Sequence, residues 1–158
     1  MESEVFEIPA PNSILVETFE RKPFAPVDTA ISIYKETLRL CLKMPKRYTY
    51  LILQDVIHLA GEVMDYSKKA NSVFAHNAHE QQIRIDFWIY ARSSLQALST
   101  RIDRFLEVPG TLNCKDEETG KSKRITRKEL LNLLDLIISE QNLLTNQIKE
   151  ESEKLNNY

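Results

Sequence analysis

The chain has 158 residues, of which 42% are hydrophobic and 28% are charged, so it is long enough to form one domain around one core. Only three glycines and six prolines are present, which argues against an all-β fold with its frequent turns. The formal net charge of −2 excludes a globally basic nucleic-acid binder, although a local basic patch stays open. The sequence therefore predicts a single all-α domain.

Residues 1–26 contain four of the six prolines and are expected to form an extended N-terminal arm. A free tail seldom carries large apolar residues such as Phe6, Ile8 and Leu15, so we expect the arm to pack on the bundle or on a neighbouring subunit. The chain start lacks the features of a signal peptide, and no run of 18 apolar residues could span a membrane. Two cysteines are too few for a disulfide framework, so a protein of the reducing cytoplasm is expected.

Apolar residues at spacings of three and four predict four helices, at about residues 28–44, 47–70, 78–108 and 127–152. Mostly short links between them imply an antiparallel, up-down-up-down four-helix bundle over residues 27–158. The predicted fold is thus this bundle with an extended arm in front of it.

Two of the helix starts carry recognisable capping residues. Asp28 is the expected N-cap of the first helix, and Pro45 is expected to end that helix. Asn77 precedes Glu80 by three residues, which is the spacing of a capping box at the start of the third helix.

The fourth helix is preceded by a polar stretch, residues 111–123, that we expect to be an irregular connection. Thr126 and Glu129 have the spacing of a second capping box. Beyond Lys149 the chain loses hydrophobicity, so we expect its end to fray.

The third helix is apolar on two sides. The stripe expected to face the core consists of Ile83, Phe87, Tyr90, Ala91, Leu98, Ile102 and Phe105. Trp88, with Ile85 and Ile89, lies on another side, where exposure would create a patch that monomers avoid. Either the arm covers this side or a second subunit does, and we predict a homo-oligomer with these three residues at or near the contact.

No catalytic, cofactor or metal site is predicted. A Gly-rich phosphate loop and a Gly-x-Ser-x-Gly motif are both absent. His76 and His79 lack further ligands with metal-site spacing, and His58 is expected to be partly buried. Ser93 and Ser94 lie in the middle of a helix with no activating group in the sequence pattern, so we expect a protein that is not an enzyme.

Glu80 and Arg84 are four residues apart on the third helix. One interpretation is a surface pair worth about 0.3–0.5 kcal/mol. The other is a largely buried pair that fixes how the preceding loop meets the bundle. The sequence leaves both open.

Two basic clusters flank the helix junctions. They consist of Lys43, Lys46 and Arg47 around Pro45, and of Lys121, Lys123, Arg124, Arg127 and Lys128 at the start of the fourth helix. Cations at a helix N-terminus oppose the helix macrodipole, which suggests a nearby anion such as a phosphate backbone or an acidic partner surface. The alternative is a solvated loop whose charges contribute little.

The segment from Leu42 to Thr49, LKMPKRYT, resembles the F-P-K-x-x-R-[FY] turn of a family of small bacterial four-helix bundles. That family comprises ribosomal-RNA intervening-sequence proteins and the Avd accessory proteins of diversity-generating retroelements. Residues 71–74, followed by Asn77, Glu80, Arg84 and Ala91, resemble the second half of the Avd-like pattern. The resemblance covers roughly residues 30–108.

This resemblance implies a bacterial or phage-encoded bundle that assembles as a homopentameric barrel and binds a reverse transcriptase and its RNA. It also implies that the basic residues around Pro45 belong to a contact surface. We therefore expect a non-enzymatic accessory protein without a cofactor. The alternative is a structural or adaptor bundle of a phage or mobile element that binds protein only, which the acidic balance and the apolar arm favour.

Overall fold

The computed structural model describes residues 23–44, 46–48, 52–107, 113–115, 122–125 and 127–158. It describes the backbone alone for Arg47, Arg127 and residues 105–107, 113–115 and 122–124. The predicted arm up to residue 22, Lys121 and the predicted cap Thr126 lie outside the described residues.

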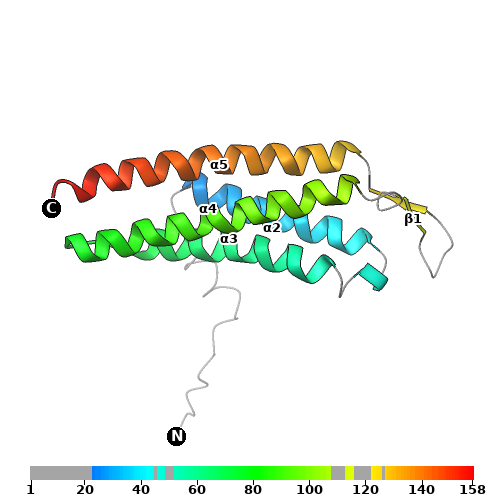
Figure 1. Cartoon of the computed structure of the whole chain (residues 1–158), viewed down its shortest axis with the longest axis horizontal. Helices are drawn as coiled ribbons and strands as arrows, with labels where there is room; N and C mark the ends of the chain where they lie inside the picture. The colour runs from blue at the N-terminus through cyan, green and yellow to red at the C-terminus, as the bar shows by residue number, and fades with distance from the viewer. Residues whose placement is uncertain (1–22, 45, 49–51, 108–112, 116–121, 126) are drawn as a thin grey trace, which may run out of the picture.

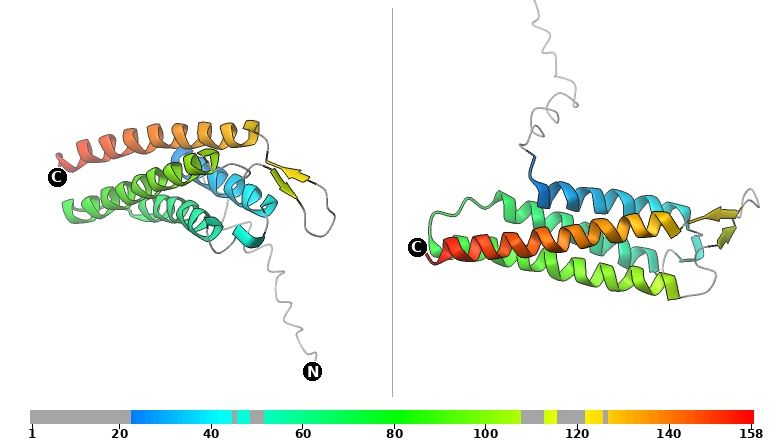
Figure 2. Two further views of the ribbon diagram at one scale, coloured as in Figure 1. Left: turned by 45° about the vertical axis from the view of Figure 1, so that its right-hand side comes forward. Right: turned by 90° about the horizontal axis from the view of Figure 1, so that it is seen from above.

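The described residues contain four long helices: α2 (Ala25–Lys43), α3 (Gln54–Ser72), α4 (Ala78–Glu107) and α5 (Arg127–Leu155). They run alternately up and down, and each packs on the next helix in the chain (Figures 1 and 2). α5 also packs on α2, which closes the bundle. The predicted all-α antiparallel four-helix bundle is confirmed.

α2 begins earlier than predicted. Its N-cap is Phe24, and Pro26 lies in the first helical turn. Backbone N–H groups in this turn make no intrahelical hydrogen bond, so a proline, which has no N–H, is tolerated there. Asp28 is therefore not the N-cap. Its carboxylate accepts a hydrogen bond from the Phe24 N–H at 3.0 Å and so stabilises the helix start from inside. The prediction that residues 25 and 26 belong to an extended arm is wrong.

α3 begins at Gln54, well after the predicted start at residue 47. A 3-10 turn, η1 (Lys46–Tyr48), precedes it, and residues 49–51 lie outside the described part of the chain. Side chains three residues apart share a face in a 3-10 helix as well as in an α-helix. The apolar spacing therefore could not separate the turn from the helix.

The connection between α4 and α5 contains a short β-ladder, not only irregular chain as predicted. β1 (Asn113–Lys115) pairs antiparallel with β2 (Ser122–Arg124), with Cys114 opposite Lys123. Backbone hydrogen bonds hold such a ladder together. Its polar residues give no apolar alternation, so the sequence pattern did not indicate it.

Asn77 is confirmed as the cap of α4, because its Oδ1 accepts a hydrogen bond from the Glu80 N–H at 2.9 Å. The Glu80 carboxylate accepts from the His76 N–H at 2.7 Å, one residue before the position that a capping box would use. At the far end, α5 continues to Leu155, so the expected fraying after Lys149 is wrong. Glu151 is buried there and ties the helix to α4.

The two apolar sides of α4 are arranged differently from the prediction. Trp88 and Ile85 lie in the core, and Trp88 packs against Phe24 with ring centroids 6.0 Å apart. Tyr90, assigned to the core stripe, is 51% exposed. It lies with the half-buried Phe87 beside Tyr66 of α3, at centroid distances of 5.5 and 6.4 Å from the Tyr66 ring. The buried hydrophobic residues of α4 are Ile85, Trp88, Ala91, Leu95, Leu98 and Ile102.

Candidate functional site

The fold brings both predicted basic clusters to the same end of the bundle. α2 ends there, η1 follows, and α5 begins there after the β1–β2 hairpin (Figure 1). Lys43, in the last turn of α2, forms an ion pair with Glu129 in the first turn of α5. We call the described parts of residues 43–48 and 113–129 the basic end.

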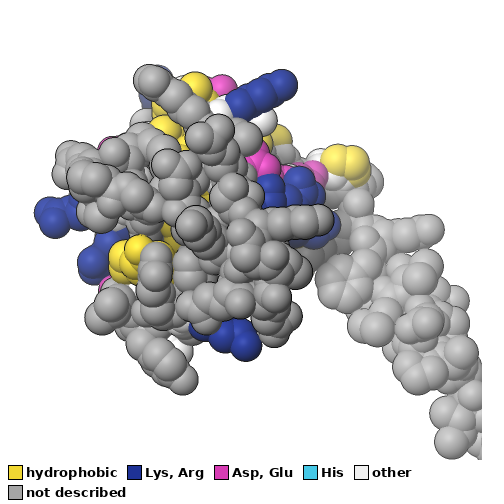
Figure 3. Space-filling model, turned by 90° about the vertical axis from the view of Figure 1, so that its right-hand side faces the viewer, with side chains coloured by type: hydrophobic (Ala, Val, Ile, Leu, Met, Phe, Trp, Pro, Cys, Tyr) yellow, Lys and Arg dark blue, Asp and Glu magenta, His cyan; other side chains and the backbone are white. Residues whose placement is uncertain are grey.

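The candidate cations differ in their surroundings. Lys46 and Lys128 are exposed to solvent. Lys43 is half-buried in its pair with Glu129, so it joins two helices and is not a free cation. Figure 3 looks onto this end, and Lys and Arg side chains stand at several places around its edge. Backbone alone is described for Arg47, Lys123, Arg124 and Arg127.

The charges of the chain are unevenly divided. Residues 43–48 and 113–129 hold nine of the 21 Lys and Arg residues but only four of the 23 Asp and Glu residues. The remaining sequence carries twelve basic and nineteen acidic residues. The net charge of −2 is therefore the sum of a basic portion and an acidic portion. A charged partner is attracted by the local electrostatic field, so the basic portion can bind an anion.

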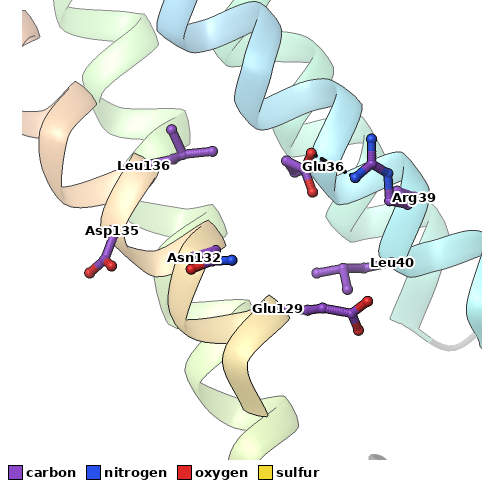
Figure 4. Close-up of a pocket in the computed structure, with 7 residues that line it drawn as sticks. All are labelled: Glu36, Arg39, Leu40, Glu129, Asn132, Asp135 and Leu136. Atoms are coloured by element: carbon purple, nitrogen blue, oxygen red, sulfur yellow. Dashed lines mark ion pairs between the residues drawn. The ribbon is translucent and has the colours of Figure 1, made fainter. Parts of the chain in front are cut away.

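A groove between α2 and α5 adjoins the basic end and has a volume of about 490 Å³ (Figure 4). α2 contributes Glu36, Arg39 and Leu40, and α5 contributes Glu129, Asn132, Asp135 and Leu136. The Leu40 and Glu129 side chains extend across the groove toward the opposite helix, whereas Asp135 points away from α2. The groove therefore has one leucine on each wall and mostly acidic charged residues.

A buried polar cluster lies toward the opposite end. Arg84 does not pair with Glu80, as both readings of the sequence assumed, but with Glu151 of α5, at an Nε–Oε1 distance of 3.0 Å. Its Nη1 also donates hydrogen bonds to the carbonyl oxygens of Ala70 (3.0 Å) and Val73 (2.9 Å). Arg84 thus fixes the α3–α4 loop against the bundle, as one interpretation expected. Its carboxylate partner is Glu151, whereas the sequence suggested Glu80.

Glu151 is 1% exposed and fully engaged. Gln81 donates to its Oε2 at 2.6 Å, and Gln147 donates to its Oε1 at 2.8 Å. Burial raises the pKa of this carboxyl, but the hydrogen bond from Gln81 and the charges of Arg84 and Lys154 outweigh it, so the pKa is lowered. The sequence reading missed these residues, although Gln147 and Glu151 continue the core spacing of α5.

Glu140 lies on the same face of α5 and is completely buried. Neither of its carboxylate oxygens has a hydrogen-bond partner among the described residues. The neighbouring Gln141 donates to Gln96 of α4 at 3.0 Å, which places Glu140 level with the middle of that helix. Burial raises the pKa of Glu140 to about 8, so this carboxyl is protonated at neutral pH.

Among the described residues, His58 and Ser94 both contact Glu62. His58 is exposed, not partly buried as predicted, and its Nε2 lies 2.9 Å from Oε1 of Glu62 one turn later. The Ser94 hydroxyl donates to the other oxygen of Glu62 at 2.8 Å. A nucleophilic serine needs its own contact to a general base such as histidine, and here the carboxylate lies between the two.

No metal site is expected from the sequence at His76 and His79. His76 and His79 are exposed beside the start of α4. Within the described part of the chain, no group of three or more His, Cys, Asp or Glu side chains is arranged to hold a metal ion. Burial raises the pKa of the Cys41 thiol to about 11, so this thiol stays protonated and unreactive at neutral pH.

The predicted oligomer contact needs correction. Trp88 is 0% exposed and Ile85 is 4% exposed within a single chain, so neither side chain is available to a second subunit. Ile89 is 37% exposed and is the one member of this set at the surface. Phe24 covers part of the Trp88 ring, which is why the apparent second stripe of α4 is not an exposed patch.

No family model, curated protein or solved structure matches the chain. Among the described helices, none combines the length and the apolar character needed to cross a lipid bilayer.

Proposed function

We propose that this protein is a non-enzymatic accessory protein of a reverse-transcriptase ribonucleoprotein, and that its basic end binds RNA. One observation carries the proposal: two basic clusters that are far apart in the sequence meet at one end of the bundle. A phosphate backbone is the ligand that such a surface suits, because each cation that contacts a phosphate releases condensed counterions.

Two described cations offer the cleanest test. Lys46 and Lys128 are exposed and lie on different elements of the basic end. The measurement is binding of a single-stranded RNA of about 20 nucleotides by fluorescence anisotropy at several salt concentrations. In the double variant Lys46→Gln/Lys128→Gln, the plot of log affinity against log salt should become shallower by about 0.7 for each lysine removed.

The matched control is the double variant Lys35→Gln/Lys149→Gln. Both lysines are exposed, and they lie on α2 and α5 outside the basic end. This variant has the same net charge as the test variant and should keep the wild-type salt dependence. Wild-type protein that binds no RNA at moderate salt, or equal slopes in the two double variants, would contradict RNA binding at the basic end.

The proposed protein partner is the reverse transcriptase of a diversity-generating retroelement, because residues 42–49 and 71–91 resemble the Avd pattern. The full chain would be co-expressed with such a polymerase and purified through a tag, with and without ribonuclease. Retention of the polymerase after ribonuclease treatment is the expected result. If the polymerase is lost both with and without ribonuclease, the protein does not bind this polymerase.

The second candidate is an adaptor bundle that binds protein only. It is favoured by apolar side chains on the outside of α5, where Leu131 is 47% and Ile138 is 55% exposed. Alanine at Lys43, Lys46 and Arg47 distinguishes the two candidates. If every interaction of the protein survives this triple change, the adaptor function is favoured over RNA binding.

The proposal places the protein in the cytoplasm as a homo-oligomer, with a pentamer implied by the family resemblance. The proposed subunit contact includes the surface residue Ile89 and excludes Trp88, which is enclosed in the core. Sedimentation equilibrium at micromolar concentration measures the assembly directly. A monomer at that concentration would remove the oligomer from the proposal.

A further inference from the structure

The groove between α2 and α5 has a chemistry that differs from that of the adjoining basic end. The half-buried Leu136 provides apolar surface on the α5 wall, and Leu40, which is 8% exposed, adds a small amount on the α2 wall (Figure 4). The groove is open to solvent and has a volume of about 490 Å³. The groove therefore offers room and apolar surface to another molecule.

The charged residues of the groove are mostly acidic. Glu36, Glu129 and Asp135 line it together with one cation, Arg39. Arg39 pairs with Glu36 at 3.2 Å, and Lys43 pairs with Glu129 at the end of the groove. Asp135 is exposed at the outer edge. With Lys43 counted, the three carboxylates and two cations of the groove carry a net charge of −1, so the groove favours a cationic ligand over a phosphate backbone.

We propose that this groove docks a basic amphipathic helix of a partner polypeptide. A valley between two antiparallel helices accepts a third helix, whose apolar residues at i, i+3 or i+4, and i+7 enter it. Those residues cover Leu40 and Leu136, while Lys or Arg on the flanks of the incoming helix face Glu36 and Asp135. The proposal concerns a polypeptide alone, so it holds or fails independently of RNA binding at the basic end.

Two synthetic helical peptides test the charge argument. Both carry leucines at the same i, i+3 and i+7 positions, and their flanking positions are all Lys in one and all Glu in the other. Binding to the full-length protein is measured by fluorescence anisotropy, and the contact is located by amide chemical-shift changes. The Lys peptide should bind at least about tenfold more tightly and should shift the amides of residues 36–40 and 129–136.

Charge reversal in the groove supplies the variant. Glu36→Lys/Asp135→Lys should weaken the Lys peptide by at least about tenfold. Asp65→Lys/Glu153→Lys changes the net charge equally at exposed positions outside the groove, and its affinity should stay within about twofold of wild type. Thermal melts of both double variants check that each is folded.

Each of the other outcomes overturns the proposal. No binding of the Lys peptide, equal binding of the two peptides, or equal losses in the two double variants would show that the groove does not select a basic helix. A change in the protein's own sedimentation on reversing Glu36 and Asp135 would make a second copy of the chain the occupant. RNA that, added without peptide, shifts the amides of residues 36–40 and 129–136 would make nucleic acid the occupant.

Discussion

Glu140 and Glu151 lie on the same buried face of α5, eleven residues and about three helical turns apart. The pKa values of these two buried carboxyls are nevertheless shifted in opposite directions. Glu151 meets the Arg84 guanidinium and two glutamine amides, and its pKa is lowered. Glu140 meets no hydrogen-bond donor among the described residues, and its pKa is raised to about 8. Desolvation acts on both carboxyls, and only Glu151 is compensated.

The first prediction concerns the pH dependence that Glu140 imposes. The folded protein binds the Glu140 proton more tightly than the unfolded chain does, between the ordinary pKa of 4.5 and about 8. The free energy of unfolding should therefore fall as pH rises through this window, by up to about 1.4 kcal/mol per pH unit. Glu140→Gln should remove this slope, as measured by urea unfolding between pH 5 and about pH 9.

Glu153 supplies the control for Glu140, since it is exposed on the same helix. Glu153→Gln should keep the slope of the wild-type protein. Identical slopes in Glu140→Gln and wild type would mean that the pKa of Glu140 is not raised in the folded state.

The second prediction concerns the buried pair of Arg84 and Glu151. Arg84→Met should reduce the free energy of unfolding by about 3–5 kcal/mol at pH 7, because it leaves a buried carboxylate without its cation. The matched control is Lys154→Met. The Lys154 side chain lies 3.6 Å from the same carboxylate, but it is 62% exposed to solvent. This change should cost less than about 1 kcal/mol. Equal losses in the two variants would contradict the role given to Arg84.

The same pair should make the protein sensitive to acid. The pKa of Glu151 is lowered in the folded state, so its contribution to stability is complete above the unfolded value of 4.5 and is lost as pH falls through the folded pKa. Arg84→Met removes a cause of the lowering. Its free energy of unfolding should therefore decline less than that of wild type below pH 4.5, in parallel urea titrations. A steeper decline in the variant would contradict this assignment.

The third prediction follows from the position of Trp88 in the core. Trp88→Ala should reduce the free energy of unfolding by about 3–5 kcal/mol, because it leaves a cavity beside Phe24. Its sedimentation should match that of wild type under conditions where both are folded. Ile89→Ala, at a partly exposed position on the same helix, should change stability by only about 0.5 kcal/mol. A changed assembly state in Trp88→Ala alone would restore Trp88 to a subunit contact.

The fourth prediction tests the start of α4. Asn77→Ala removes the acceptor of the Glu80 N–H and should cost about 0.5–2 kcal/mol in denaturant melts. Asn77→Asp keeps an acceptor at the same place and should leave stability almost unchanged. If alanine and aspartate behave alike, the cap contributes nothing to the stability of the helix.

Features that depend on near neighbours along the chain could be predicted from the sequence. Apolar spacings of three and four indicated all four helices, because residues at those spacings share one side of a helix. Asn77 could be identified as a cap because its hydrogen-bond partner, Glu80, is three residues away. The same core spacing on α5 passes through Glu140, Gln147 and Glu151, so their burial was open to prediction from the pattern.

Contacts between distant segments could not be predicted from the sequence and were found in the folded chain. Periodicity gave α4 two apolar sides, but the contact of Trp88 with Phe24 shows which of them is enclosed. Arg84 has Glu80 one turn before it, yet its partner is Glu151 of α5, which the packing of α4 against α5 places beside it. The ion pair of Lys43 with Glu129 likewise joins two basic clusters that the sequence separates. Helix spacing is a local property of the backbone, whereas the partner of a side chain depends on how whole helices pack.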